Sequence, residues 1–269
     1  FIGVGSDLEY KILNNFSLTA GGEIRYEING YDRIDDDLSG LYIERFTLGF
    51  NTVGGKTTYG KQCGMIDKYI YYNDLSRETG YAPWSGETQC STDEDNMMLN
   101  HVYTYDKGRV GFTYNHEYEA MAFAGNYKIG MFDVGGTAIY SGDPREFGPN
   151  DEFKDRLIFT LGTTVRIGKI TVVGKYGYDN YTMINGEDQN TQGFIVGAGY
   201  NITDKWRVIA QYNGKIYNDV MTDVNGYDYD DYVVMNTTYS LNKYVTLLAE
   251  YKGGSENGDV LFLKAYIYI

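Results

Sequence analysis

The chain has 269 residues, and its 37 Asp and Glu outnumber its 23 Lys and Arg, which gives a formal net charge of −14 and an isoelectric point near 4.5. So acidic a chain is not expected to bind nucleic acid, because that function needs a basic face. The mean hydropathy is −0.42 and no run reaches the ~18 apolar residues of a membrane-spanning helix, so a helical membrane protein is excluded. With 29 Tyr, 34 Gly and only 3 Pro, the composition favours an all-β chain.

Apolar and polar side chains alternate along most of the chain, which is the pattern of a strand with one apolar face. In residues 109–115, Val110, Phe112 and Tyr114 share one face, while polar residues and glycine occupy the other. This period of two predicts fifteen strands in the sequence. They span residues 1–12, 16–29, 41–52, 55–65, 96–106, 109–117, 121–129, 131–142, 155–167, 169–181, 191–202, 206–218, 232–241, 244–253 and 259–269.

The connections between these strands alternate between short and long. Short turns rich in Gly, Asn, Asp and Lys are predicted at 14–15, 54–55, 107–108, 168–169, 203–205 and 242–243, with a further tight turn near 130. Long, mostly acidic loops are predicted at 31–40, 66–95, 143–154, 182–190, 219–231 and 253–258. Short turns at one end and long loops at the other are typical of a transmembrane antiparallel β-barrel. The alternative is a soluble β-sandwich, which does not sort its loops by length.

The strand count predicts one barrel domain over residues 1–269. Bacterial barrels have an even number of strands, with both termini at the short-turn, periplasmic side. Here the last strand ends at that side, whereas the first begins at the long-loop side. We therefore expect sixteen strands in the full protein, with one strand preceding Phe1. A miscounted hairpin near 118–131, which would give fourteen, is the alternative.

The same alternation predicts which charged residues face the lumen. These are Glu23, Arg25, Glu27, Arg45, Arg109, Lys128, Arg166, Lys175, Arg207, Lys215, Glu250 and Lys252. The register of 41–50 leaves either Glu44 or Arg45 pointing inward. Because acidic loops concentrate cations, the net charge predicts a cation-preferring pore.

One stretch resembles a known family. The segment GLYIERFTLGF, a short turn and Tyr59-Gly60-Lys61-Gln62 are similar to the general diffusion porins of Gram-negative bacteria, in which Arg is more usual than Lys at the third position. In those porins the third loop folds into the barrel and narrows the pore. The resemblance assigns that loop to about 66–95, where Ala82-Pro83-Trp84-Ser85-Gly86-Glu87-Thr88 is similar to the family's Pro-Glu-Phe-Gly-Gly-Asp-Thr. The family's loop glutamate has no counterpart, since Trp84 follows Pro83.

The resemblance implies a constriction with a basic wall facing an acidic loop. Lys61 takes the place of the porin arginine, and Glu87 corresponds to the loop aspartate. We expect the basic wall to be Arg25, Arg45, Lys61 and Lys175, and the loop side to be Asp74, Glu78, Tyr81, Trp84 and Glu87. The resemblance also implies a homotrimer in the bacterial outer membrane, with long loops extracellular and short turns periplasmic.

Two cysteines bracket the predicted constriction loop. Cys63 and Cys90 have 26 residues between them, and we expect them to form a disulfide because the periplasm is oxidising. A metal site at these cysteines has no nearby His to support it, and no cofactor is expected.

These features predict a porin for passive diffusion of ions and small hydrophilic solutes, in contact with the lipid bilayer and lipopolysaccharide. A sugar- or oligosaccharide-specific channel is the alternative, since an aromatic run in the third loop resembles a lining for sugars. That run is Tyr69, Tyr71, Tyr72, Tyr81 and Trp84. An adhesive or structural barrel is a third possibility. Only His101 and His116 are present, without a nucleophile motif, so the sequence predicts that the chain is not an enzyme.

Overall fold

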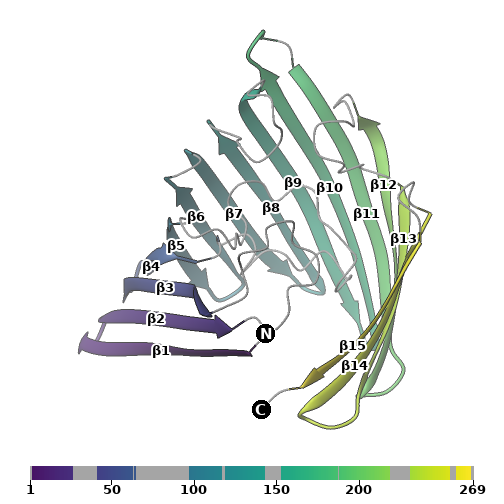
Figure 1. Ribbon diagram of the computed structural model, residues 1–269, viewed down its shortest axis with the longest axis horizontal. Coiled ribbons are helices and arrows are strands. Elements are labelled where there is room, and N and C mark those ends of the chain that lie inside the picture. The colour runs from purple at the N-terminus through teal and green to yellow at the C-terminus, as the bar shows by residue number, and fades with distance from the viewer. Residues whose placement is uncertain are drawn as a thin grey trace.

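The computed structural model is a single antiparallel sheet of fifteen strands, which pair in chain order (Figure 1). It describes residues 2–26, 41–62, 64, 97–116, 119–142, 153–186, 188–218, 231–254 and 259–267. The strands are β1 (Ile2–Leu13), β2 (Phe16–Tyr26), β3 (Leu41–Thr52), β4 (Gly55–Lys61), β5 (Met97–Tyr105), β6 (Gly108–Asn115), β7 (Ala120–Ile129), β8 (Phe132–Ser141), β9 (Phe153–Ile167), β10 (Ile170–Met183), β11 (Asp188–Asn201), β12 (Trp206–Asn218), β13 (Tyr232–Ser240), β14 (Val245–Gly253) and β15 (Val260–Ile267). Within the described ranges there is no helix long and apolar enough to cross a membrane.

The predicted fold class is confirmed, and so are the fifteen strands of the sequence. Most strand bounds agree with the prediction within about three residues, because the period of two identifies a strand before any tertiary contact is known. The edges of the sheet are β1 and β15, and none of the strand pairings of the described chain joins them. The sixteenth strand stays a prediction.

One predicted loop is wrong. Residues 182–183 end β10 and residues 188–190 begin β11, and the two strands continue to pair as far as Thr182 opposite Asp188. The Thr182 hydroxyl donates to Asp188 Oδ1 at 3.0 Å, and the turn contains Gly186 at a φ of 87°. The polar composition that predicted a loop therefore belongs to strand ends that hydrogen-bond across the hairpin.

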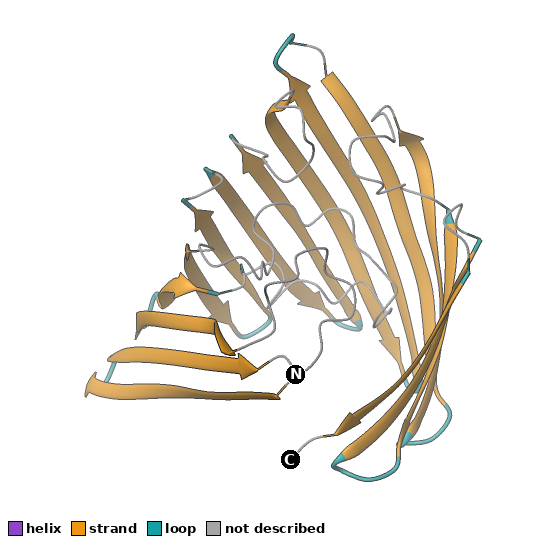
Figure 2. Cartoon of the chain, viewed as in Figure 1, coloured by secondary structure: helices purple, strands orange, loops and turns teal. Residues whose placement is uncertain are grey.

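Seven short connections gather at one end of the sheet, which we call the short-turn end. They are 14–15, 53–54, 106–107, 130–131, 168–169, 202–205 and 241–244, drawn in teal in Figure 2. Two of them contain a residue with positive φ, Gly130 at 60° and Gly168 at 57°, a conformation that glycine adopts at little cost. We call the opposite end the long-loop end.

The two faces of the sheet have opposite chemistry. On β9, Arg156 and Thr164 are almost fully buried, whereas Leu161, which alternates with them, is 62% exposed. On β10, Asp179 is fully buried and Ile170 is 44% exposed. We call the first face, which is buried and largely polar, the inner face, and the second the outer face. This distribution is the reverse of a soluble domain and is that of a barrel surrounded by lipid.

Aromatic side chains on the outer face concentrate near the short-turn end. Tyr103, Tyr105 and Tyr127 stack in series, with ring centroids 6.1 Å apart at each step. The Trp206 indole N–H donates to Thr237 Oγ1 at 2.7 Å. Rings with a polar tip are favoured where hydrocarbon meets water, so this belt is consistent with one membrane interface at the short-turn end.

Candidate pore wall

The most buried polar contact of the inner face is an ion pair between β9 and β10. Arg156 Nη2 lies 2.5 Å from Asp179 Oδ2, and Arg156 Nε donates to Asp179 Oδ1 at 2.9 Å. The two side chains are 1% and 0% exposed. The guanidinium also lies 4.7 Å from the ring centroid of Tyr181, its direct cross-strand neighbour. A two-point geometry of this kind satisfies both charges where water is excluded.

A second polar group follows on β13 and β14. The amide of Asn236 donates to Glu250 Oε2 at 2.9 Å, and Glu250 is fully buried. Farther along the same strands, Lys252 Nζ lies 4.2 Å from the ring centroid of Tyr232. The wall here therefore carries both signs of charge within two strands.

The inner face of β1–β3 carries an ion pair at a glycine. Arg45 Nη1 donates to Asp7 Oδ1 at 2.6 Å, and the two side chains are 22% and 69% exposed. Both approach the position where a Cβ of Gly21 would stand, so a larger residue at 21 would push them apart. Ser17 hydrogen-bonds to Glu9 on the neighbouring strand.

Neutral polar pairs complete the wall on the middle strands. Thr113 donates to Asn100 Oδ1 at 2.6 Å between β6 and β5. Thr137 and Thr160 share a hydrogen bond of 2.6 Å between β8 and β9. Cross-strand polar contacts thus extend over much of the described inner face, as expected for a surface that adjoins water rather than lipid.

Basic side chains outnumber acidic ones at the paired inner-face positions whose side chains the structure describes. The basic residues are Lys11, Arg45, Lys56, Arg109, Lys128, Arg156, Arg166, Lys175, Arg207, Lys252 and Lys264. The acidic residues are Asp7, Glu9, Glu23, Asp133, Asp179 and Glu250. The wall is therefore basic although the chain as a whole is acidic.

Three of the four predicted basic-wall residues occupy inner-face positions. Arg45, rather than Glu44, is the inward residue of β3, as its contact with Asp7 from β1 demonstrates. Lys175 lies on the inner face between Gly162 and Ile195. Arg25 occupies an inner-face register position, but its side chain lies outside the described residues.

For the fourth residue, Lys61, the predicted inward position is wrong. It pairs with Phe46 on β3 and Met97 on β5, so it occupies the outer face, while the neighbouring Gly60 takes the inner face. The inward polar residue is the next one, Gln62, whose amide donates to Met98 O at 3.0 Å and to Thr58 O at 3.2 Å. A lysine at an outer-face position at the end of a strand is tolerated, because its long side chain can extend to the boundary between membrane and water.

The predicted constriction loop, 66–95, lies outside the described residues, as do Cys63 and Cys90. The loop residues Asp74, Glu78, Tyr81, Trp84 and Glu87 and the disulfide stay predictions.

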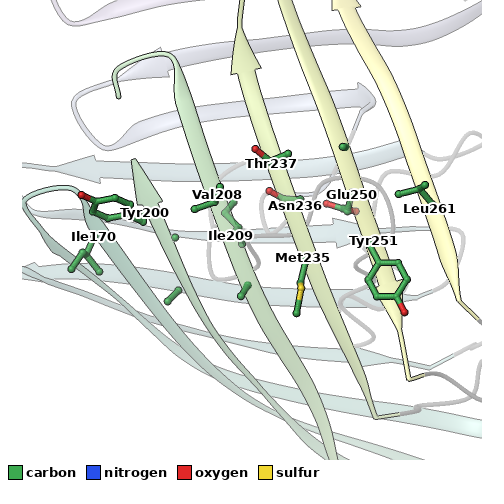
Figure 3. Close-up of a pocket in the computed structure, with 14 residues that line it drawn as sticks. Ile170, Tyr200, Val208, Ile209, Met235, Asn236, Thr237, Glu250, Tyr251 and Leu261 are labelled. Carbon is green, nitrogen blue, oxygen red and sulfur yellow. Dashed lines mark hydrogen bonds between the residues drawn. The ribbon is translucent and has the colours of Figure 1, made fainter. Parts of the chain in front are cut away.

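An apolar groove of about 650 Å³ lies on the outer face, across β10–β15 (Figure 3). Its lining includes the small residues Ala198, Ala210 and Ala249 and the larger Tyr200 and Tyr251, which have the outer parity of their strands. Three further lining residues, Ile209, Asn236 and Glu250, have the inner parity.

Both histidines lie off the inner face or at its rim. His101 is on the outer parity of β5, where its Nδ1 is 2.9 Å from Thr57 Oγ1. His116 follows the last residue of β6, and its ring centroid lies 6.3 Å from that of Tyr114, with the two rings tilted by 44°.

No protein-family profile matches the chain, and no curated protein matches it in sequence. Solved structures do match. A loop L8 deletion mutant of OmpT, an outer membrane protein of Vibrio cholerae, superposes with a TM-score of 0.76 at 18% identity, over 99% of this chain and 90% of that one. Salmonella typhi OmpF in complex with daunomycin gives 0.72 at 14% identity, over 99% and 89%. An anion-selective porin from Comamonas acidovorans gives 0.70 at 14%, over 99% and 84%.

At these identities the likeness shows the fold. The resemblance to the general porins is confirmed at this level, and the neighbours' description as outer-membrane proteins and porins agrees with the predicted outer-membrane location. The prediction that the chain is not an enzyme is corrected. Neighbours at 18% identity include several OmpT structures besides the porins, and a shared fold at that distance gives no ground for excluding an enzyme.

Proposed function

We propose that the chain forms a water-filled channel through the outer membrane, through which ions and small hydrophilic solutes diffuse passively. One observation supports this most directly. Charged and polar side chains such as Arg156, Asp179 and Glu250 lie on the inner face, beside buried apolar ones such as Ile158 and Ile195, whereas the exposed outer face is largely apolar; the sheet therefore presents one face suited to lipid and keeps its charges on the other. The porin fold of the structural neighbours supports the same function.

The expected cation preference has no support from the described wall. At its paired positions basic side chains are about twice as frequent as acidic ones, and charged rings lining a pore select ions of opposite sign. The alternative of a sugar-specific channel depends on aromatic residues between 69 and 84, which stay a prediction.

We also propose that the barrel assembles as a homotrimer in contact with lipid and lipopolysaccharide. A solved neighbour, OmpT of Vibrio cholerae, is a trimer form, which supports a trimer without fixing which strands meet.

Planar-bilayer recording of the purified, folded protein tests the channel. We expect ohmic conductance steps. A matched pair of variants on adjacent β9 positions localises the path: Thr160→Trp adds bulk to the inner face and lowers the step size, whereas Leu161→Trp on the outer face leaves it unchanged. Folded protein that gives no steps, or equal effects of the two variants, would contradict the proposal.

A further inference from the structure

Positive charge gathers at the short-turn end of the sheet. Within three residues of its seven short turns there are ten Lys and Arg but three Asp, and all of these windows are described. The basic residues are Lys11, Lys56, Lys107, Arg109, Lys128, Arg166, Lys169, Lys205, Arg207 and Lys243. The acidic residues are Asp106, Asp133 and Asp204. This end therefore carries a net charge of +7, and with −14 for the whole chain the remainder carries −21.

Six of the ten basic residues stand on the inner face, at or next to its terminal paired position on six different strands. They are Lys11 on β1, Lys56 on β4, Arg109 on β6, Lys128 on β7, Arg166 on β9 and Arg207 on β12, and we call them the basic ring. The other four basic residues lie in the turns themselves. The basic ring thus follows the short-turn edge of the inner face from β1 to β12 (Figure 1).

Four side chains of the basic ring, Lys11, Lys56, Lys128 and Arg166, are exposed. The Arg207 guanidinium lies over Gly199, whose missing side chain leaves room for it, since a Cβ there would stand 3.0 Å from Arg207 Nη2.

Asp133 is the one acid at an inner-face position within the seven described windows. It is opposite Lys128 in the register, and it accepts a hydrogen bond of 2.8 Å from Asn126 Nδ2. The acids Asp106 and Asp204 belong to the turns. One carboxylate against six basic side chains leaves this edge of the lumen strongly positive.

The direction of these side chains decides whether a basic residue can contact lipid headgroups or faces the lumen. Lysines in the turns can reach lipid headgroups, but an inner-face residue cannot, because the barrel wall lies between it and the bilayer. Charges at a mouth flanked by low-dielectric walls raise the local concentration of counter-ions. At 0.1 M salt the Debye length is about 10 Å, roughly the width of two strands, so the fields of ring residues one or two strands apart overlap.

We infer that the basic ring is an anion-binding mouth, which collects small polyvalent anions with phosphate or carboxylate groups from the compartment on the short-turn side. The inference rests on the proposed channel and assigns the class of solute that this mouth favours. Exposed cationic side chains around one opening supply the charge-assisted hydrogen bonds that such anions need.

The test is one-sided block of the channel by inorganic tripolyphosphate in a planar bilayer. Orientation is determined with a membrane-impermeant thiol reagent on Asn242→Cys, a short-turn position, in a chain with Cys63 and Cys90 replaced by serine. We expect the concentration for half block to be at least about tenfold lower from the short-turn side than from the other side. The difference should vanish in 1 M salt, where the Debye length is about 3 Å.

A matched pair of variants assigns the effect to the ring. The variant K11Q/K56Q/K128Q/R166Q removes four ring charges, and K107Q/K169Q/K205Q/K243Q removes four charges from the turns of the same end. We expect the first to abolish the one-sided block and the second to retain most of it. Each variant is first checked for folding by the heat-dependent shift of its gel mobility.

Three results would overturn the inference: equal block from both sides, block that survives 1 M salt, or an equal loss of block in the two variants. The first two results are measured on the wild-type protein, so they test the inference even if a variant does not fold. An absence of conductance from folded wild-type protein is a different result, which contradicts the proposed channel itself.

Discussion

The two faces of β9 and β10 share one backbone and one set of hydrogen-bonded neighbours, yet they are built for opposite surroundings. On the inner face Arg156 and Asp179 form a two-point ion pair with almost no exposure. On the outer face of the same strands Leu161 and Ile170 are 62% and 44% exposed without any polar partner to cover them. The pattern makes sense only if the outer surroundings are lipid and the inner ones are polar.

This difference shows that the energetic consequence of placing a charge differs between the two faces. A charge that is buried on the inner face must be paired, because its partner replaces the water it has lost. A charge on the outer face has no partner to gain and meets hydrocarbon. Substitutions on the two faces should therefore cost stability for different reasons and by different amounts.

The largest effect is expected at the buried ion pair. Replacing Arg156 with Leu leaves the Asp179 carboxylate buried without its main partner, which should lower the free energy of unfolding by about 3–5 kcal/mol. The double variant Arg156→Leu, Asp179→Leu should recover much of that loss, because neither charge is then left alone. Urea unfolding in lipid vesicles measures both. A single-variant loss below about 1 kcal/mol, or a double-variant loss equal to the sum of two single losses, would contradict this account.

A smaller effect is expected from a charge placed on one face or the other. Leu161→Arg puts a guanidinium on the outer face and should cost about 2–4 kcal/mol if that position lies near the bilayer midplane. Thr160→Arg, the matched change on the inner face, should cost about 1 kcal/mol through loss of its hydrogen bond to Thr137. The same unfolding assay compares the two, and equal costs would mean that the faces have been assigned wrongly.

The smallest effect is expected at the ion pair between Arg45 and Asp7. Because these side chains are 22% and 69% exposed, water screens the charges, and Arg45→Gln should change the unfolding free energy by no more than about 1 kcal/mol. Comparison of this variant with Arg156→Leu tests whether burial causes the larger loss of unfolding free energy. A cost equal to that of Arg156→Leu would show that exposure does not govern these pairs.

Much of this architecture can be predicted from the two-residue alternation of apolar and polar side chains in the sequence. Alternation alone predicts the fifteen strands and places Lys175 inward, because successive side chains of a strand must point to opposite faces, whereas the choice between Glu44 and Arg45 needs the register of β3. The two-residue turn at Gly168-Lys169 also fixes the register in which Arg156 faces Tyr181, so this pairing follows from the sequence once the turn is placed.

The failures have physical causes too. The family motif places Lys61 inward, but one residue of register reverses a side chain, and Gly60 holds the inner position instead. The polar composition of 182–190 predicts a loop because Asn, Asp and Thr favour turns, yet at the ends of β10 and β11 Thr182 and Asp188 hydrogen-bond across the strand pair. Both errors concern tertiary register, which composition does not contain.

Cysteine scanning of β9 tests the central claim most directly, namely that the polar inner face lines a water-filled lumen. In a chain with Cys63 and Cys90 replaced by serine, single cysteines are placed from Leu157 to Thr164 and treated with a membrane-impermeant thiol reagent in lipid vesicles. We predict that the inner position Thr160 reacts, that the outer positions Phe159 and Leu161 do not, and that the buried inner positions Ile158 and Thr164 react more slowly than Thr160. Uniform labelling, or labelling of the opposite set, would contradict the account.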